Sequence, residues 1–169
     1  MLWPDGEAST NMVQYAELSN ARDDAAKAVF PDVKVIVHLQ NGQTNSLYRW
    51  LFDGLKNNGG KWDVIGMSLY PDADSWLEYN NTCIANMKDM VSRYGSEVMI
   101  CEVGMAWDEP VAAKLFLTDL LTRAQVISDE KCLGVFYWEP EAYNGWKIYC
   151  KGAFDDSGKP IVAPDAFAK

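Results

Sequence analysis

Cysteine, histidine and basic residues are scarce in this chain of 169 residues, which has 4 Cys, 1 His and 15 Lys and Arg. The cysteines Cys83, Cys101, Cys132 and Cys150 form no Cys-x-x-Cys pair and have no histidine-rich surroundings. A zinc site is therefore not expected, and the spacing is unlike that of a disulfide scaffold. Because Cys101 lies inside an apolar run, we expect it to be a buried free thiol.

The shortage of basic residues against 24 Asp and Glu gives a formal charge of -9. Nucleic acids and anionic membranes are disfavoured partners, because both need a basic patch. The sequence lacks G-x-G-x-x-G and Walker loops, so no nucleotide cofactor is expected. No run approaches the roughly 18 apolar residues of a membrane span, and no signal peptide is visible. A neutral polymer remains compatible, and 7 Trp and 8 Tyr supply flat amphipathic rings.

Four short apolar runs predict buried strands: VKVIVHL (33–39), DVIGMSLY (63–70), VMICEVG (98–104) and LGVFYWE (133–139). They are nearly continuous rather than alternating, which is typical of a parallel sheet covered on both faces. Helical spacing precedes each run and predicts four core-facing stripes. These comprise Leu18, Ala21, Ala25 and Val29; Leu47, Trp50, Leu51, Gly54 and Leu55; Cys83, Met87, Met90, Val91 and Tyr94; and Leu117, Leu120, Leu121, Ala124 and Ile127. Trp3–Gly6 predicts a turn, with Ser9 or Thr10 as the first helix N-cap.

The alternation of helix and strand defines a series of βα units, with strand starts 30 to 35 residues apart. Two folds compete: a doubly wound, flavodoxin-like sheet and a (β/α)8 barrel, which needs about eight units and ~250 residues. Every strand is apolar at its start and polar or aromatic at its carboxyl end. Barrels place their active sites on that face. The pattern therefore favours a (β/α)8 TIM barrel of which this chain forms about half.

Glu102 is the sharpest candidate for chemistry, because a carboxylate in an apolar strand is costly unless it is paired. At a strand's carboxyl end it suits a glycosidase nucleophile, although a Glu in a structural salt bridge is an equal alternative. Retaining glycosidases need a second carboxyl group about 5–5.5 Å away. The candidates for that partner, all less well placed, are Asp72, Asp74, Asp108, Glu109 and Glu139.

Three other strand-end residues are candidates for substrate contacts. His38, the single histidine, is suited to a sugar hydroxyl, although a lone His is more often structural. Tyr70 is placed to hydrogen-bond the nucleophile or to cap the core. Trp138 offers a ring face to a pyranose or packs at the top of the sheet. Tyr143 and Trp146, in the following loop, are weaker candidates of the same kind.

Six motifs occur in order along the chain: MLWPDG, VIVHLQNG, DVIGMSLYP, CEVGMAW, GVFYWEP and GAFDDSGKP. Together they resemble glycoside hydrolase family 53, the endo-β-1,4-galactanases that act on arabinogalactan. The resemblance covers essentially the whole chain. It implies that residues 1–169 are the C-terminal half of one TIM-barrel catalytic domain, with strands 5 to 8. The acid/base Glu of strand 4 would then lie a few residues before Met1.

The resemblance also implies roles for particular residues. Glu102 in CEVG matches the nucleophile of strand 7, and Trp138 in FYWEP matches a sugar-stacking residue of strand 8. The substrate-binding residues implied on strands 5 and 6 are His38, Asn41, Ser68 and Tyr70. The chain departs from the usual pattern at Leu69, where Tyr is common, and at Val103, where Thr is common. Some relatives bind calcium in a late loop, but Asp155 and Asp156 alone are too few ligands to predict a metal here.

The expected function is that of a retaining endo-β-1,4-galactanase on the galactan or arabinogalactan of plant pectin. The full-length enzyme would be secreted, periplasmic or at the cell surface. The isolated chain would be inactive and would self-associate through open barrel edges. The alternatives are a barrel glycosidase for another β-glycan, a non-catalytic carbohydrate-binding remnant and a flavodoxin-like domain without sugar chemistry.

Overall fold

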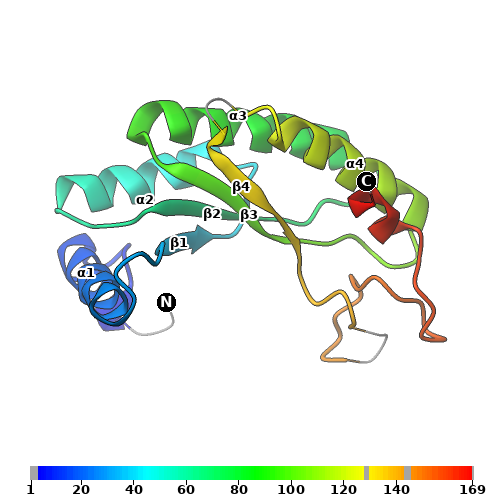
Figure 1. The fold of residues 1–169 in the computed structure, drawn as a ribbon, viewed down its shortest axis with the longest axis horizontal. Coiled ribbons are helices and arrows are strands. Elements are labelled where there is room, and N and C mark those ends of the chain that lie inside the picture. Colours follow the sequence, from blue (N-terminus) through cyan, green and yellow to red (C-terminus); the bar gives the residue numbers. More distant parts are fainter. Residues whose placement is uncertain (1–3, 128–129, 143–145, 169) are drawn as a thin grey trace.

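The computed structural model describes residues 4–127, 130–142 and 146–168 (Figure 1). A short 3-10 helix, η1 (Pro4–Gly6), is followed by alternating helices and strands and, near the end of the chain, by the 3-10 helix η3 (Ala163–Phe167). The alternating elements are α1 (Met12–Val29), β1 (Ile36–Leu39), α2 (Asn45–Asn57), β2 (Val64–Leu69), α3 (Trp76–Tyr94), β3 (Glu97–Val103), α4 (Pro110–Ala124) and β4 (Cys132–Tyr137). No helix in these described ranges is long and apolar enough to cross a membrane.

The four strands form one sheet in the order β1-β2-β3-β4, and every neighbouring pair is parallel. Helices α2, α3 and α4 cover a single face of this sheet, and α1 lies beside β1 (Figure 1). A doubly wound sheet carries helices on both faces and reverses its strand order. The flavodoxin-like alternative is therefore wrong, and the predicted partial (β/α)8 barrel is confirmed.

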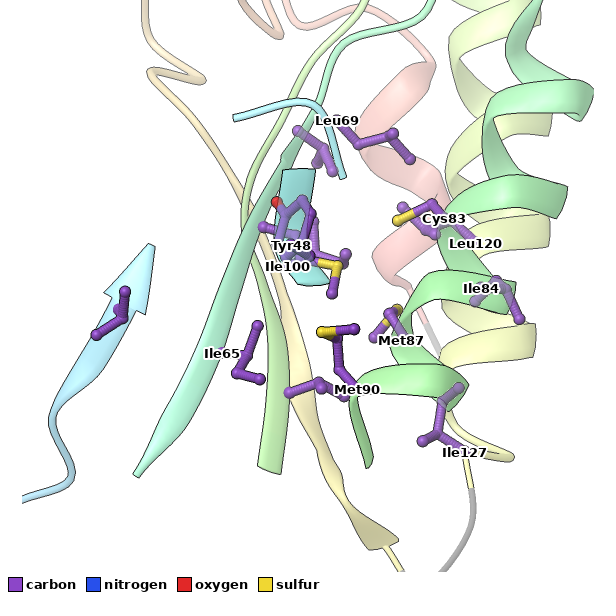
Figure 2. Packing of buried hydrophobic residues seen from close by; sticks show 14 of the residues in the cluster. Tyr48, Ile65, Leu69, Cys83, Ile84, Met87, Met90, Ile100, Leu120 and Ile127 are labelled. Atoms are coloured by element: carbon purple, nitrogen blue, oxygen red, sulfur yellow. The ribbon is translucent and has the colours of Figure 1, made fainter. Parts of the chain in front are cut away.

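The core lies between the sheet and its helices, as Figure 2 shows. Ile65 and Leu69 of β2 and Ile100 of β3 face Met87 and Met90 of α3, and all five side chains are fully buried. The predicted stripes of α3 and α4 supply much of this core. In α2, Leu51 and Leu55 are buried but Trp50 is 46% exposed, contrary to expectation.

An extra residue in β3 changes the direction of its last side chains. Met67 pairs with Ile100, but the next residue, Ser68, pairs with Glu102, so Cys101 is accommodated as a bulge. Ile100 consequently faces the helices, while Glu102 meets Ser68 on the opposite face. Cys101 is only partly buried rather than fully buried as expected, and burial raises the pKa of its thiol. All four cysteines are free.

Helix α1 differs from its sequence prediction in two ways. Its N-cap is Asn11, whose side-chain oxygen accepts from the Gln14 amide at 3.1 Å. The hydroxyls of Ser9 and Thr10, the predicted caps, donate to the Glu7 carboxylate instead. The predicted core stripe Leu18, Ala21, Ala25 and Val29 is exposed. Its buried positions are Ala16, Ser19 and Asp23.

Contacts with α2 and with Asp63 explain why α1 buries the side with Ser19 and Asp23 rather than its apolar stripe. The helix packs on α2 through Met12, which occupies the space where a side chain at Gly54 would lie. Asp23 and Asp63 both pair with Lys27, at 3.0 and 2.9 Å, so the charged side of α1 faces the β1–β2 edge. No strand in the described part of the chain lies beyond β1 to cover the apolar side.

Candidate active site

Side chains from three strand ends converge on the Glu102 carboxylate. Tyr70, just after β2, donates its hydroxyl to Glu102 Oε2 at 2.9 Å, and Ser68 donates to the same oxygen at 3.2 Å. Parallel strands bring their carboxyl ends to one edge, and the bulge of β3 turns Glu102 toward that cluster. The Glu102 side chain is 25% exposed, and the two hydroxyls offset part of the cost of removing its charge from water.

His38 of β1 joins this cluster through Ser68. His38 Nε2 lies 2.7 Å from Ser68 Oγ. Because the Ser68 hydroxyl proton is directed at Glu102, the Ser68 oxygen accepts from an Nε2–H, and this assigns the Nε2-protonated form of the ring. His38 Nδ1 lies 4.0 Å from Glu102 Oε1, beyond hydrogen-bonding distance. The three side chains thus form a directed chain of donors from His38 to the carboxylate.

A cavity of about 220 Å³ opens beside the carboxylate. Its lining residues are Gln40, Asn41, Gln43, Ser68, Tyr70, Tyr79 and Glu102. Asn41 has a positive φ of 57°, which side-chain amide residues tolerate better than most. Gln43 Oε1 is buried without a hydrogen-bond partner among the described residues. Gln40, Gln43 and Tyr79 were not among the residues predicted from the sequence, and the Gln43 side-chain oxygen is an acceptor without a partner among the described residues.

Two tyrosines next to the carboxylate are held in their neutral form. Burial first, and then the hydrogen bond to Glu102, raise the pKa of Tyr70 far above its ordinary value. Burial likewise raises the pKa of Tyr149 to about 12, and the nearby charges of Glu102 and Glu139 act in the same direction. Both phenols are therefore hydrogen-bond donors at any physiological pH.

Trp138 does not line the cavity, although it follows the neighbouring strand β4. Its backbone amide donates to the Val103 carbonyl at 3.0 Å, and the residue is 44% exposed. Phe136 is 63% exposed two residues earlier. Of the weaker aromatic candidates, Trp146 lies at a separate cavity with Glu139, and Tyr143 falls outside the described residues.

None of the proposed second carboxylates lies in the Glu102 cavity within the described part of the chain. Asp72, Asp74, Asp108 and Glu109 are exposed on loops. Glu139 lines a different cavity of about 280 Å³ with Glu141, Ala142 and Trp146. Among the described residues, the Glu102 cavity therefore provides one oriented carboxylate and a set of hydroxyl and amide groups for polar contacts, with no second carboxyl group in its lining.

A carboxylate at the carboxyl ends of parallel strands, on the uncovered face of a half-closed sheet, places the chain among (β/α)8-barrel proteins. The family model of glycosyl hydrolase family 53 matches residues 1–159, and the chain belongs to that family.

Known galactanases support this assignment. The chain is 27% identical to the probable arabinogalactan endo-beta-1,4-galactanase A of Neosartorya fischeri, over 83% of this chain and 45% of that protein. It is 30% identical to the arabinogalactan endo-beta-1,4-galactanase of Cellvibrio japonicus, over 72% of this chain and 36% of that protein. The chain spans about half the length, or less, of the curated relatives that it matches.

Solved structures agree on the fold. The GH53 catalytic domain of Ignisphaera aggregans superposes with a TM-score of 0.77 at 26% identity, covering 99% of this chain and 55% of that one. A structure from a study of two fungal beta-1,4-galactanases superposes with a TM-score of 0.84 at 20% identity, covering 100% and 58%. The four strands and the helices that precede them, from α1–β1 to α4–β4, therefore correspond to part of a (β/α)8 barrel.

Proposed function

We propose that residues 1–169 form the C-terminal half of a retaining endo-β-1,4-galactanase barrel and carry its nucleophile, Glu102. The observation that carries the proposal is the convergence of the Tyr70 and Ser68 hydroxyls on Oε2 of this carboxylate. Both donors occupy one oxygen, so Oε1 keeps its lone pairs for attack. The galactanase names of the relatives support the choice of substrate.

The proposed reaction has two steps. Glu102 Oε1 attacks the anomeric carbon, the glycosidic C–O bond breaks, and its electron pair leaves with the oxygen. That oxygen takes a proton from a carboxylic acid, which we propose lies in the full-length enzyme outside residues 1–169. The same group then removes a proton from water, and the water oxygen displaces Glu102 from the anomeric carbon. Ser68 and Tyr70 hold the carboxylate through both steps.

The remaining site residues are assigned to the substrate. His38 and Asn41 contact sugar hydroxyls, with His38 held toward the site by Ser68. Trp138 presents its exposed ring to a neighbouring galactosyl unit. The polymer is β-1,4-galactan or arabinogalactan, which lies outside cells, so the full-length enzyme acts in a secreted, periplasmic or surface-bound form.

The proposal is tested on the full-length gene product that contains this chain. Reducing-sugar release is measured on β-1,4-galactan and on a panel of other β-glycans, and proton NMR follows the anomer first released. We expect galactan alone to be cleaved, with the β-anomer appearing first. Glu102→Gln should abolish cleavage, whereas Glu97→Gln, at the opposite end of β3, should not. Initial release of the α-anomer, or an active Glu102→Gln variant, would contradict the proposal.

A carbohydrate-binding role without turnover is the second candidate. It is favoured by the single carboxylate in the Glu102 cavity among the described residues. Saturable binding of galactan oligosaccharides by a full-length product that cleaves none of the panel would support this candidate over the first.

A further inference from the structure

Gln43 lies in the loop between β1 and α2 and lines the Glu102 cavity. Its side-chain oxygen Oε1 is buried and has no hydrogen-bond partner among the described residues. An unpaired buried acceptor is costly, so such an atom normally receives a proton from a donor in the protein or in a ligand. The groups on the two sides of the loop indicate which of these sources is open to Gln43.

The donors on the side of α2 and α3 are already in use. Gln43 also lines a second cavity there, of about 350 Å³, together with Asn45, Arg49, Asn86 and Asp89. Asn45 Nδ2 donates to Asn86 Oδ1 and to Asp89 Oδ2, both at 2.8 Å. Arg49 donates to Asp89 through Nε and Nη2, at 2.8 and 2.6 Å, and Asn86 Nδ2 donates to a loop carbonyl at 2.8 Å. These side chains pair with one another and with the backbone, so they give the Gln43 oxygen no donor.

The hydroxyl protons on the side of the carboxylate are in use as well. Ser68 and Tyr70 have one proton each, and both protons are directed at Glu102 Oε2. These two hydroxyls therefore cannot donate to Gln43. A ligand that carries hydroxyl groups into the Glu102 cavity would supply the donor that the Gln43 oxygen lacks.

The loop that carries Gln43 is fixed through the preceding residue, Gly42. The Gly42 amide donates to the Ser68 carbonyl at 2.8 Å, and the Gly42 carbonyl accepts from the buried Asn86 side chain at 2.8 Å. A side chain at Gly42 would have its Cβ only 3.1 Å from Cys83 Sγ and 3.2 Å from the Ser68 carbonyl. The loop thus packs tightly on the end of β2 and on α3, and this holds the Gln43 backbone in place before a ligand binds.

We propose that Gln43 is a substrate-binding residue whose side-chain oxygen accepts a hydrogen bond from a hydroxyl of the galactosyl unit that Glu102 attacks. This inference rests on the proposed galactanase function. Gln43 and Glu102 line the same cavity of about 220 Å³, so a sugar that meets the carboxylate there lies against Gln43 as well. A site built to bind a hydroxyl rejects an analogue that lacks it, because the buried acceptor is then left unpaired.

The test compares kcat/KM for four substrates of the full-length gene product. The parent is a β-1,4-galactobioside with a 2,4-dinitrophenyl leaving group, and the three analogues lack the hydroxyl at carbon 2, 3 or 6 of the sugar next to that group. Active sites are counted by the burst of dinitrophenol from the 2-deoxy-2-fluoro galactobioside, which separates rate per site from the amount of folded enzyme.

Three variants are compared with the wild type. Gln43→Met removes the acceptor at similar side-chain length, and Gln43→Glu keeps an acceptor oxygen. Gln14→Met, at a partly buried glutamine of α1, is the matched control.

We expect loss of one of the three hydroxyls to lower kcat/KM about tenfold more in the wild type than in Gln43→Met. This excess isolates the bond to Gln43, because the intrinsic effect of each deoxy substitution is the same in both proteins. Gln43→Glu and Gln14→Met should keep the excess.

Equal penalties in the wild type and in Gln43→Met for all three analogues would overturn the inference and leave the proposed function standing. Loss of the excess in Gln43→Glu would also overturn it, because that variant retains the acceptor oxygen. A wild type that shows neither burst nor turnover would overturn the inference together with the proposed function.

Discussion

Hydroxyl groups, rather than a cationic side chain, orient the Glu102 carboxylate. Among the described residues, two hydroxyls lie against its Oε2 and an imidazole nitrogen lies 4.0 Å from its Oε1. A cationic partner would hold a carboxylate more strongly and make it a poorer nucleophile. Hydroxyl donors instead orient the group while leaving one oxygen accessible, which suits a carboxylate that must form and release a bond to carbon.

The hydrogen bond from Tyr70 should matter for turnover. In the full-length gene product, Tyr70→Phe removes a bond to a charged acceptor, worth about 1.5–3 kcal/mol. We expect kcat on galactan to fall roughly 10- to 100-fold, with the melting temperature little changed. Steady-state kinetics measures this effect. Tyr94→Phe is the matched control, because it removes a 2.8 Å tyrosine–carboxylate bond, to Asp53, remote from the Glu102 cavity. Equal losses in the two variants would contradict a specific role for Tyr70.

The exposed ring of Trp138 should contribute to binding. Stacking uses the area and quadrupole of an aromatic ring, which an aliphatic side chain lacks. Trp138→Ala should therefore weaken galactan-oligosaccharide binding more than tenfold in the full-length product, as measured by titration calorimetry. Trp50→Ala serves as the control, since Trp50 on α2 is 46% exposed, close to the 44% of Trp138. Unchanged affinity in an intact Trp138→Ala variant would make this residue merely structural.

Some residues of the candidate site could be predicted from the sequence, and others could not. Strand-end positions located His38, Ser68, Tyr70 and Glu102, because parallel strands share one edge. Tyr149 carries no such signal: two positive φ angles return it to the site from a loop, and loop conformation has no periodic pattern in sequence.

At the scale of elements, the strands were the most predictable part of the fold. Their apolar runs located each strand within about three residues, as in 33–39 against Ile36–Leu39. The bulge at Cys101 was not predictable, because an extra residue leaves the apolar run unbroken. Helix α1 was placed correctly along the chain but with the wrong face buried. Ion pairs of Lys27 and the packing of Met12 against Gly54 set the orientation of α1. These tertiary contacts cannot be predicted from the spacing of apolar residues.

Asp63 links α1 to the sheet, and we expect the stability of this link to depend on pH. Its carboxylate accepts from the Val35 amide at 2.7 Å and from Lys27 at 3.0 Å. Burial alone would raise the pKa of Asp63, but these two hydrogen bonds outweigh it and lower the pKa below the ordinary 3.8. The stability contributed by ionised Asp63 is therefore fully present above the unfolded-state pKa and lost as the pH falls through the folded-state pKa.

Asp63→Asn should accordingly lower the free energy of unfolding by about 1 kcal/mol at pH 7, mainly through a weakened bond to Val35. The difference from wild type should shrink as the pH falls below about 4. Urea unfolding of the full-length product at pH 7 and at pH 3 measures both values. Asp24→Asn, in an exposed ion pair with Lys61, should change little at either pH. A difference that grows toward acid pH would refute this account of Asp63.

At the scale of the whole molecule, several apolar surfaces are left open. Within the described part of the chain, no further strand pairs with the outer edges of β1 and β4. Leu133 and Phe136 of β4 are 42% and 63% exposed, and Leu18 and Val29 of α1 are 44% and 68% exposed. In a closed barrel these edges pair and the inward-facing side chains fill layers in the centre. The other half of the proposed barrel would be expected to cover these surfaces.

The isolated 169-residue chain should therefore self-associate. Open edges of hydrophobic strands pair readily with other chains. Light scattering coupled to size exclusion should show dimers or larger species, and Phe136→Lys should shift the distribution toward monomer. The isolated chain should also release no reducing sugar from β-1,4-galactan, since general acid catalysis typically contributes 10²–10⁴-fold. A monodisperse, cooperatively melting monomer that cleaves galactan would refute the half-barrel interpretation.

The central claim is that Glu102 forms a covalent bond to the sugar, and one measurement addresses it directly. The full-length gene product is incubated with the 2-deoxy-2-fluoro galactobioside, whose glycosyl–enzyme intermediate breaks down slowly, and is then digested and mapped by mass spectrometry. We predict one added fluorogalactobiosyl group per active site, on the peptide containing Cys101-Glu102-Val103-Gly104 and on the Glu102 side chain itself. A label on any other residue, or turnover of galactan without any label, would contradict the account.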